Sequence, residues 1–119
     1  MVDKKENQIQ KNRQRVLKFM SERYGQNLTE KQLNIALILI KEEHRDIFQA
    51  RWGMLDGAYC RRFQQLDKKL GRKDSRLEYY IALEKLEGML EDLRHVEVFQ
   101  NCEEANSVTA VGVWKLIFE

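Results

Sequence analysis

One apolar stretch, residues 29–52, constrains the fold of this chain more than any other part of the sequence. Thr29 and Gln32 have the spacing of a capping box, in which each side chain pairs with a free backbone N–H of the first helical turn. Further apolar residues recur at the i, i+3, i+4 spacing of an amphipathic helix, at Leu33, Ala36, Leu37, Ile40, Ile47, Phe48 and Trp52. We therefore expect a single helix over residues 29–52, buried on several sides, with the rest of the chain packed around it.

The composition indicates a helical globular protein that forms one domain over its 119 residues. It has 43% hydrophobic and 34% charged residues and no proline, which is typical of a folded helical chain. No apolar run approaches the ~18 residues of a membrane span, and the N-terminus lacks the apolar core of a signal peptide. We expect a cytoplasmic protein without membrane contact, in which Cys60 and Cys102 are reduced thiols. Its expected parts are a flexible stretch over residues 1–8, a helical bundle over 9–94 and a tail over 95–119.

Two further helices are expected on either side of the apolar stretch. The first runs from about residue 9 to residue 24 and ends at Gly25, which can close a helix in the left-handed conformation. The second runs from about residue 58 to residue 70 and ends at Gly71. Gly53 and an Asp-Gly pair predict a break before this second helix. The alternative is that two helices continue into each other through Gly53 without a turn.

A last, long helix is expected over about residues 76–94, where Ser75 and Glu78 have the spacing of a second capping box. Apolar residues step along it by four and three in a heptad-like seam, which indicates packing in a bundle or against a partner. The interface residues that this seam predicts are Leu83, Leu86, Leu90 and Leu93. The fold class is thus a mainly α bundle of about four helices.

The tail after residue 95 has a different character. Two runs rich in β-branched and aromatic residues surround a polar loop, which predicts a short C-terminal β-hairpin, and a helix over residues 111–118 is the alternative. Trp114 and Phe118 are too apolar to stay in solvent, so we expect them to dock on the bundle or on a partner. That partner is a second copy of the chain or a host protein.

The sequence contains no arrangement of residues that predicts catalysis. His44 and His95 are its only histidines, and no cysteine lies at metal-ligand spacing from either. Glycine-rich phosphate loops and nucleophile motifs are also absent. We therefore expect a protein that is not an enzyme and that needs no cofactor, metal or small-molecule ligand.

A basic cluster over residues 61–76 is the strongest functional signal. This stretch contains seven Lys or Arg residues and only two Asp, whereas residues 77–104 carry a net charge of −6. The cluster lies at a short turn between two helices, as in a helix-turn-helix, whose second helix enters the major groove by its N-terminal end. The nucleic-acid contacts predicted on this basis are Arg61, Arg62, Lys69, Arg72, Lys73, Ser75, Arg76 and Tyr79. The alternative is a solvated face that pairs with the acidic helix beside it.

The same region resembles the fourth conserved region of primary sigma factors and the small region-4-like regulators of phages and mobile elements. The resemblance lies in residues 45–53, 56–57, 66–77 and 83–86, and covers roughly residues 29–93. It implies a helix-turn-helix fold that binds a promoter-like duplex, RNA polymerase or both. It also implies that Leu77 and Tyr80 belong to a buried stripe.

These observations predict a small DNA-binding or transcription-regulatory protein of sigma-region-4-like type. A different class is also compatible with the sequence, namely a helical protein–protein interaction module, such as a phage or mobile-element protein that modulates a host protein without binding nucleic acid. The leucine seam and the apolar tail favour that second class. An enzyme is the third and weakest hypothesis.

Overall fold

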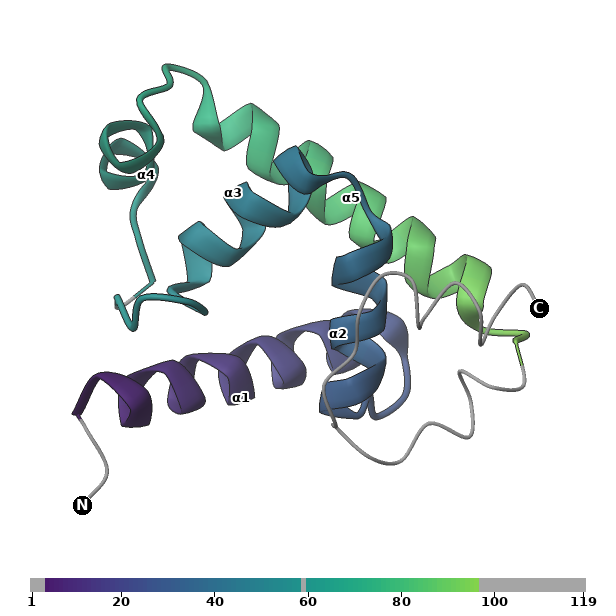
Figure 1. The fold of residues 1–119 in the computed structure, drawn as a ribbon. Coiled ribbons are helices and arrows are strands. Elements are labelled where there is room, and N and C mark those ends of the chain that lie inside the picture. Colours follow the sequence, from purple (N-terminus) through teal and green to yellow (C-terminus); the bar gives the residue numbers. More distant parts are fainter. Residues whose placement is uncertain (1–3, 59, 97–119) are drawn as a thin grey trace.

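The computed structural model describes residues 4–58 and 60–96, and this part of the chain forms five helices and no strand (Figure 1). In chain order they are α1 (Lys4–Tyr24), α2 (Glu30–Leu39), α3 (Glu42–Trp52), α4 (Phe63–Leu70) and α5 (Ser75–Leu93). The expectation of a mainly helical fold is confirmed for the described residues. The expected C-terminal hairpin falls on residues 97–119, which lie outside them.

α1 and α5 run along opposite sides of the molecule, with α2 and α3 between them (Figure 1). The two outer helices meet at one end, where the Arg94 guanidinium donates to the Tyr24 carbonyl over 2.9 Å. The buried core draws on all five helices and includes Val16, Met20, Leu33, Ile35, Ala36, Leu37, Ile47, Phe48, Leu66, Tyr79, Ala82, Leu83, Leu86, Leu90 and Leu93. α3 has its most extensive contact with α5.

The single helix expected over residues 29–52 is two helices. Its capping box is confirmed: the Gln32 amide donates to the Thr29 hydroxyl oxygen, and the Thr29 amide donates to the Gln32 side chain. The chain then becomes extended at Ile40 and Lys41, and α3 starts in a new direction. A straight helix of this length would extend about 36 Å, and no single neighbour could cover an apolar surface on all its sides. The bend lets α3 turn toward α5.

Two helix starts also differ from expectation. α1 begins at Lys4, well before residue 9, and α4 begins at Phe63 rather than near residue 58. The expected break after Gly53 is confirmed, because Gly53 has a φ of 64° and ends α3 in the left-handed conformation. The chain therefore needs residues 53–62 to return from the end of α3 to the start of α4.

Asn12 of α1 fixes the beginning of that return segment. Its side chain is almost completely buried, and its amide group donates to the carbonyls of Gly53 and Ala58 over 3.0 and 2.8 Å. A Cβ at Gly53 would lie 1.9 Å from the Ala58 carbonyl oxygen, so only glycine allows this approach. α1 thereby holds the segment that positions α4.

Candidate nucleic-acid interface

α4 and α5 are joined by a short turn, residues 71–74, that starts at Gly71. Gly71 has a φ of 65°, and its amide donates to the Asp67 carbonyl, so α4 ends at the expected residue. Figure 1 shows α4 end-on while α5 runs across the view, so the two helices cross steeply. A steep crossing and a glycine-containing turn of about three to four residues are the features of a helix-turn-helix pair.

Ser75 holds this pair together from the inside. It is completely buried: its hydroxyl donates to the Phe63 carbonyl over 3.1 Å, and its amide donates to the Asp67 carboxylate over 3.0 Å. The helix cap is Asp74, and the predicted capping box with Glu78 does not form. The prediction that Ser75 caps α5 and contacts DNA is wrong, because Ser75 is already the first helical residue and faces α4.

Tyr79 is the centre of an aromatic cluster from three helices, and its predicted role as a DNA contact is also wrong. Only 4% of its surface is exposed. Its ring stacks on Phe48 of α3 and tilts against Phe63 of α4, with centroid distances of 6.0 and 5.9 Å. Its hydroxyl accepts a hydrogen bond from the Trp52 indole over 3.0 Å. Burial raises the pKa of Tyr79, which the Trp52 hydrogen bond partly offsets.

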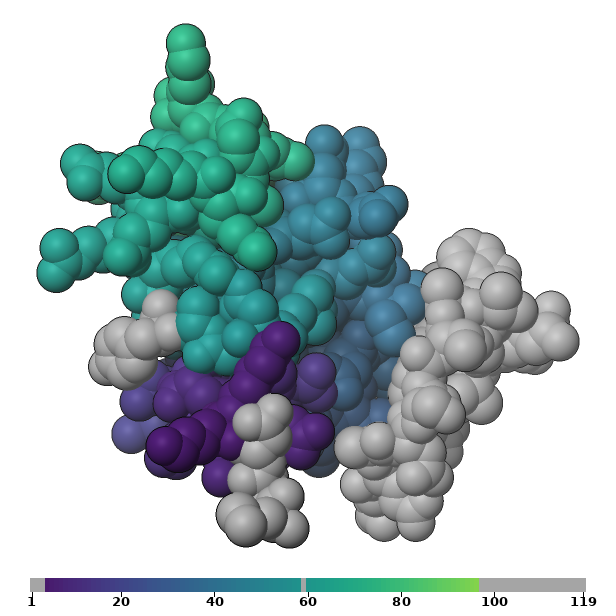
Figure 2. Space-filling view, turned by 60° about the vertical axis from the view of Figure 1, so that its left-hand side comes forward, coloured from purple at the N-terminus to yellow at the C-terminus, as the bar shows by residue number. Residues whose placement is uncertain are grey.

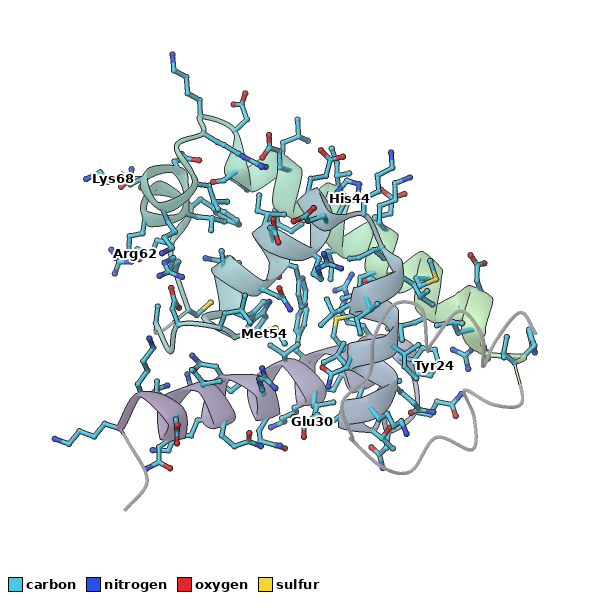
Figure 3. All side chains as sticks on the ribbon, viewed as in Figure 1. Tyr24, Glu30, His44, Met54, Arg62 and Lys68 are labelled. Carbon is cyan, nitrogen blue, oxygen red and sulfur yellow. The ribbon has the colours of Figure 1, made fainter. Side chains whose placement is uncertain are left out.

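Five of the six predicted cations are exposed, as a contact with nucleic acid requires. They are Arg62, Lys69, Arg72, Lys73 and Arg76. The prediction omitted Lys68, which is exposed on α4 within the same basic run. Figure 3 shows Arg62 and Lys68 pointing outward from α4, and Figure 2 shows long teal side chains of this region projecting beyond the body. Among the described residues, Arg62, Lys68, Lys73 and Arg76 take part in no ion pair.

Arg61 has a structural role that excludes it from this exposed set. Its backbone amide donates to the Arg51 carbonyl over 2.8 Å, and its guanidinium donates to the Ala50 carbonyl over 2.7 Å and pairs with the Asp56 carboxylate. Arg61 therefore ties the end of α3 to the approach to α4. The same contact holds the pKa of Asp56 below its usual 3.8, although burial raises that pKa.

Arg72 is exposed but already has an acidic partner. Its guanidinium pairs with the Glu78 carboxylate at 2.8 Å, which raises the pKa of Arg72. Glu43 and Asp46 of α3 raise the same pKa from farther away. This side of α5 is therefore acidic, and the free cations lie toward α4 and the turn.

The exposed face of α5 carries an apolar patch made of Leu77, Tyr80 and Ile81. Their exposed fractions are 63%, 50% and 38%. The resemblance to sigma region 4 implies buried positions for Leu77 and Tyr80, and the structure corrects this. The sequence does contain the signal: the two residues lie one helical turn apart, on the side opposite the leucine seam.

The predicted partner interface on α5 is part of the core. Leu83, Leu86, Leu90 and Leu93 are all buried against the other helices of the same chain. The heptad-like spacing was correct for a packed helix, but it could not show whether the packing partner belongs to this chain or to another. Trp114 and Phe118, the other predicted interface residues, lie outside the described residues.

Within residues 4–58 and 60–96, the side chains form no group of three or more His, Cys, Asp and Glu that could hold a metal ion. Cys60 is a free cysteine. A hollow of about 380 Å³ lies between α1 and α5, beside Tyr24 and Gly88, and ion pairs of Arg23 with Glu87 and of Arg94 with Glu91 lie at its edge. No helix in this part of the chain is long and apolar enough to cross a membrane.

The described residues thus form a small helical fold with a helix-turn-helix-like pair, and exposed cations without an ion-pair partner lie on α4, on its turn and at the start of α5. No family model matches this chain, and no match is found among curated proteins or solved structures.

Proposed function

We propose that this protein binds duplex DNA through α4, the Gly71 turn and the N-terminal half of α5, as a non-enzymatic transcription regulator. The observation that carries the proposal is the helix-turn-helix pair with unpaired cations on α4 and its turn. In such a pair the second helix enters the major groove while the first crosses the backbone. Lys and Arg on the first helix and the turn are then placed to meet phosphates.

The cations that we assign to phosphate binding differ from the sequence-based set. Lys68, Lys73 and Arg76 are exposed and have no ion-pair partner among the described residues, and Arg62 and Lys69 extend the same surface. Arg72 has a secondary role because Glu78 neutralises it. The resemblance to sigma region 4 makes RNA polymerase a candidate protein partner of the same molecule, and makes a phage or mobile element a candidate origin.

The charge distribution also favours one orientation of the proposed complex. α5 carries a net charge of −3, and four of its five acids lie in its later part, between Glu84 and Asp92. We therefore expect the duplex to contact the beginning of α5 and to stay away from its second half. Glu43 and Asp46 border α5 on the side of α3, so the phosphates should lie toward α4.

Salt dependence of binding to a duplex tests this proposal. Each phosphate that a cation neutralises adds about −0.9 to the slope of log affinity against log salt concentration. Replacing Lys68, Lys73 and Arg76 together by Ala should therefore flatten the slope by roughly 2–3. The fold should persist, because exposed charges contribute little to stability.

A matched control removes the same charge elsewhere. Lys11, Lys18 and Lys41 are exposed on α1 and at the α2–α3 corner, and their replacement by Ala should leave most of the slope in place. Equal slopes for the two triple variants would show that binding follows net charge and not this surface. A wild-type protein that does not bind a duplex at ~50 mM salt, where non-specific binding is strong, would overturn the proposal.

The apolar patch on α5 favours a second function, a protein–protein interaction module without affinity for nucleic acid. A patch of adjacent apolar side chains rimmed by charges is common at protein interfaces. In that case the triple charge variant should leave partner binding largely intact, whereas replacing Leu77 and Tyr80 by Ala should abolish it. A pull-down from a host lysate with wild type and both variants would separate the two functions.

A further inference from the structure

Two large apolar side chains stand on the part of α5 that the proposed complex places in the major groove. Leu77 and Tyr80 are 63% and 50% exposed, and they are three residues apart on one helical face. The Tyr80 ring is held by Phe63 and Tyr79, with centroid distances of 6.0 and 5.5 Å. The apolar surface is therefore presented in a defined position.

The charges around these two residues determine the direction from which a nucleic acid can approach them. Lys73 and Arg76 precede Leu77 by four residues and by one residue and are exposed, and the Arg76 guanidinium lies 6.0 Å from the centre of the Phe63 ring. On the other side Ile81 borders Glu43, His44 and Arg72, where the Arg72–Glu78 pair lies. Asp74 and Glu84 are also exposed and lie one helical turn from Leu77 and Tyr80. A polyanion that contacts these two side chains must therefore approach from the turn and α4, where Lys73 and Arg76 lie.

Apolar side chains can recognise only one feature of the major groove. Its base edges present hydrogen-bond donors and acceptors, except for the C5-methyl group of thymine, which makes apolar contacts. We infer that Leu77 and Tyr80 bind thymine methyl groups, so that the preferred ligand is a thymine-rich duplex. This inference depends on the proposed DNA binding and adds the base chemistry that the helix recognises.

The test uses two duplexes that differ only in methyl groups. One is an alternating dA·dT duplex, and the other carries deoxyuridine in place of each thymidine, with the same base pairs and the same charge. Burying a methyl group changes affinity by about three- to fourfold, so two contacts predict binding about tenfold weaker to the uracil duplex. A dG·dC duplex should in turn bind more tightly when 5-methylcytosine replaces cytosine, because the added methyl occupies the same position.

Variants assign the effect to these side chains. Leu77→Ala should reduce the thymine-to-uracil affinity ratio by about three- to fourfold, and Tyr80→Ala should reduce it further, whereas Tyr80→Phe should keep it. Leu55→Ala is the matched control, because Leu55 is 61% exposed and lies in the segment after α3. It should leave the ratio unchanged, and circular dichroism should confirm that all variants are folded.

Three outcomes would overturn the inference. A wild-type ratio near one, with tight binding to both duplexes, would leave the proposed function standing and remove only the methyl contact. A thymine-to-uracil affinity ratio well above one that neither Leu77→Ala nor Tyr80→Ala changes would show that other groups contact the methyl, and it would remove these two side chains from the inference. The absence of binding to either duplex at low salt would overturn the inference and the proposed function together.

Discussion

Arg61 and Asp56 show how single residues shape the region before α4. Their ion pair, with the bond from Arg61 to the Ala50 carbonyl, holds the chain against the end of α3. Arg61 was predicted to bind nucleic acid because it belongs to a basic run. Residue type can reveal a positive charge, but it cannot reveal that a carboxylate five positions earlier neutralises that charge. The sequence likewise could not show that Ser75 points inward, whereas Tyr79 lies four residues before Leu83, on the side of the leucine seam, so its burial could have been predicted.

The lowered pKa of Asp56 predicts how stability depends on pH at this site. A folded-state pKa below the ordinary value of 3.8 means that folding favours the charged carboxylate. The contribution of Asp56 to the free energy of unfolding is complete above pH 3.8 and is lost as the pH falls through the lowered pKa of the folded state. Asp56→Asn should therefore reduce the free energy of unfolding by about 1 kcal/mol at pH 7.

Urea unfolding of wild type and Asp56→Asn over a range of pH would measure this difference. The difference in free energy of unfolding between the two proteins should become smaller below about pH 4 and should vanish once the pH is below the pKa of Asp56 in the folded state. A gap that stays constant through this range would contradict the assignment, because it would show that the Asn side chain disturbs packing instead of removing a charge.

At the level of elements, most helix ends with a local chemical signal were predicted correctly, although the capping box expected at Ser75 does not form. The capping box of Thr29, the glycines after α1 and α4, and the break at Gly53 are all confirmed. The bend at Ile40 and the late start of α4 were missed. Both follow from tertiary packing, since α3 turns toward α5 and Asn12 of α1 holds Gly53 and Ala58. Glu42 and Glu43 could have indicated a new helix, because acidic side chains stabilise the first turn of a helix.

A comparison of Gly53→Ala with Gly71→Ala distinguishes the cost of backbone strain from the cost of a steric clash. Both are left-handed with φ near 65°, but a Cβ at Gly71 has open space, whereas one at Gly53 would meet the Ala58 backbone. Gly71→Ala should cost about 1–2 kcal/mol, the penalty of a left-handed L-residue. Gly53→Ala should cost clearly more, because the backbone around Ala58 must also move.

Thermal unfolding of the two variants would measure both costs. Similar losses of stability would indicate that the segment after α3 relaxes easily, contrary to its hydrogen bonds with Asn12 and Arg61. Gly25→Ala offers a control, because Gly25 also has positive φ and open space around its Cβ position. It should resemble Gly71→Ala.

At the level of the whole molecule, α1 completes the unit that carries the candidate interface. The helix-turn-helix pair and α3 lie within residues 42–93, yet α1 is connected to the segment after α3 through Asn12 and to the end of α5 through Arg94. The seam on α5 illustrates the limit of sequence reasoning at this scale. Its leucines were recognised as a packing surface, but only the arrangement of α1, α2 and α3 shows that the chain covers them itself.

Asn12→Ala tests how strongly α1 supports the rest. The change removes the amide donor to the Gly53 and Ala58 carbonyls, and leaving buried polar groups unpaired should cost about 1–3 kcal/mol. Chemical denaturation of Asn12→Ala beside Gln10→Ala, an exposed neighbour on the same helix, would measure the effect. Equal stabilities of the two variants would show that α1 is only loosely coupled to the segment before α4.

The apolar segment Leu33 to Ile40 has a consequence for the unfolded chain. Its eight residues carry no charge and no proline, the composition of a segment that associates with copies of itself when exposed. Folding hides most of it inside the molecule, and Lys31 and Lys41 flank it as charged gatekeepers that oppose such association. Heating should therefore produce aggregates from the unfolded chains, more so at higher protein concentration, and cooling should recover less protein than was unfolded.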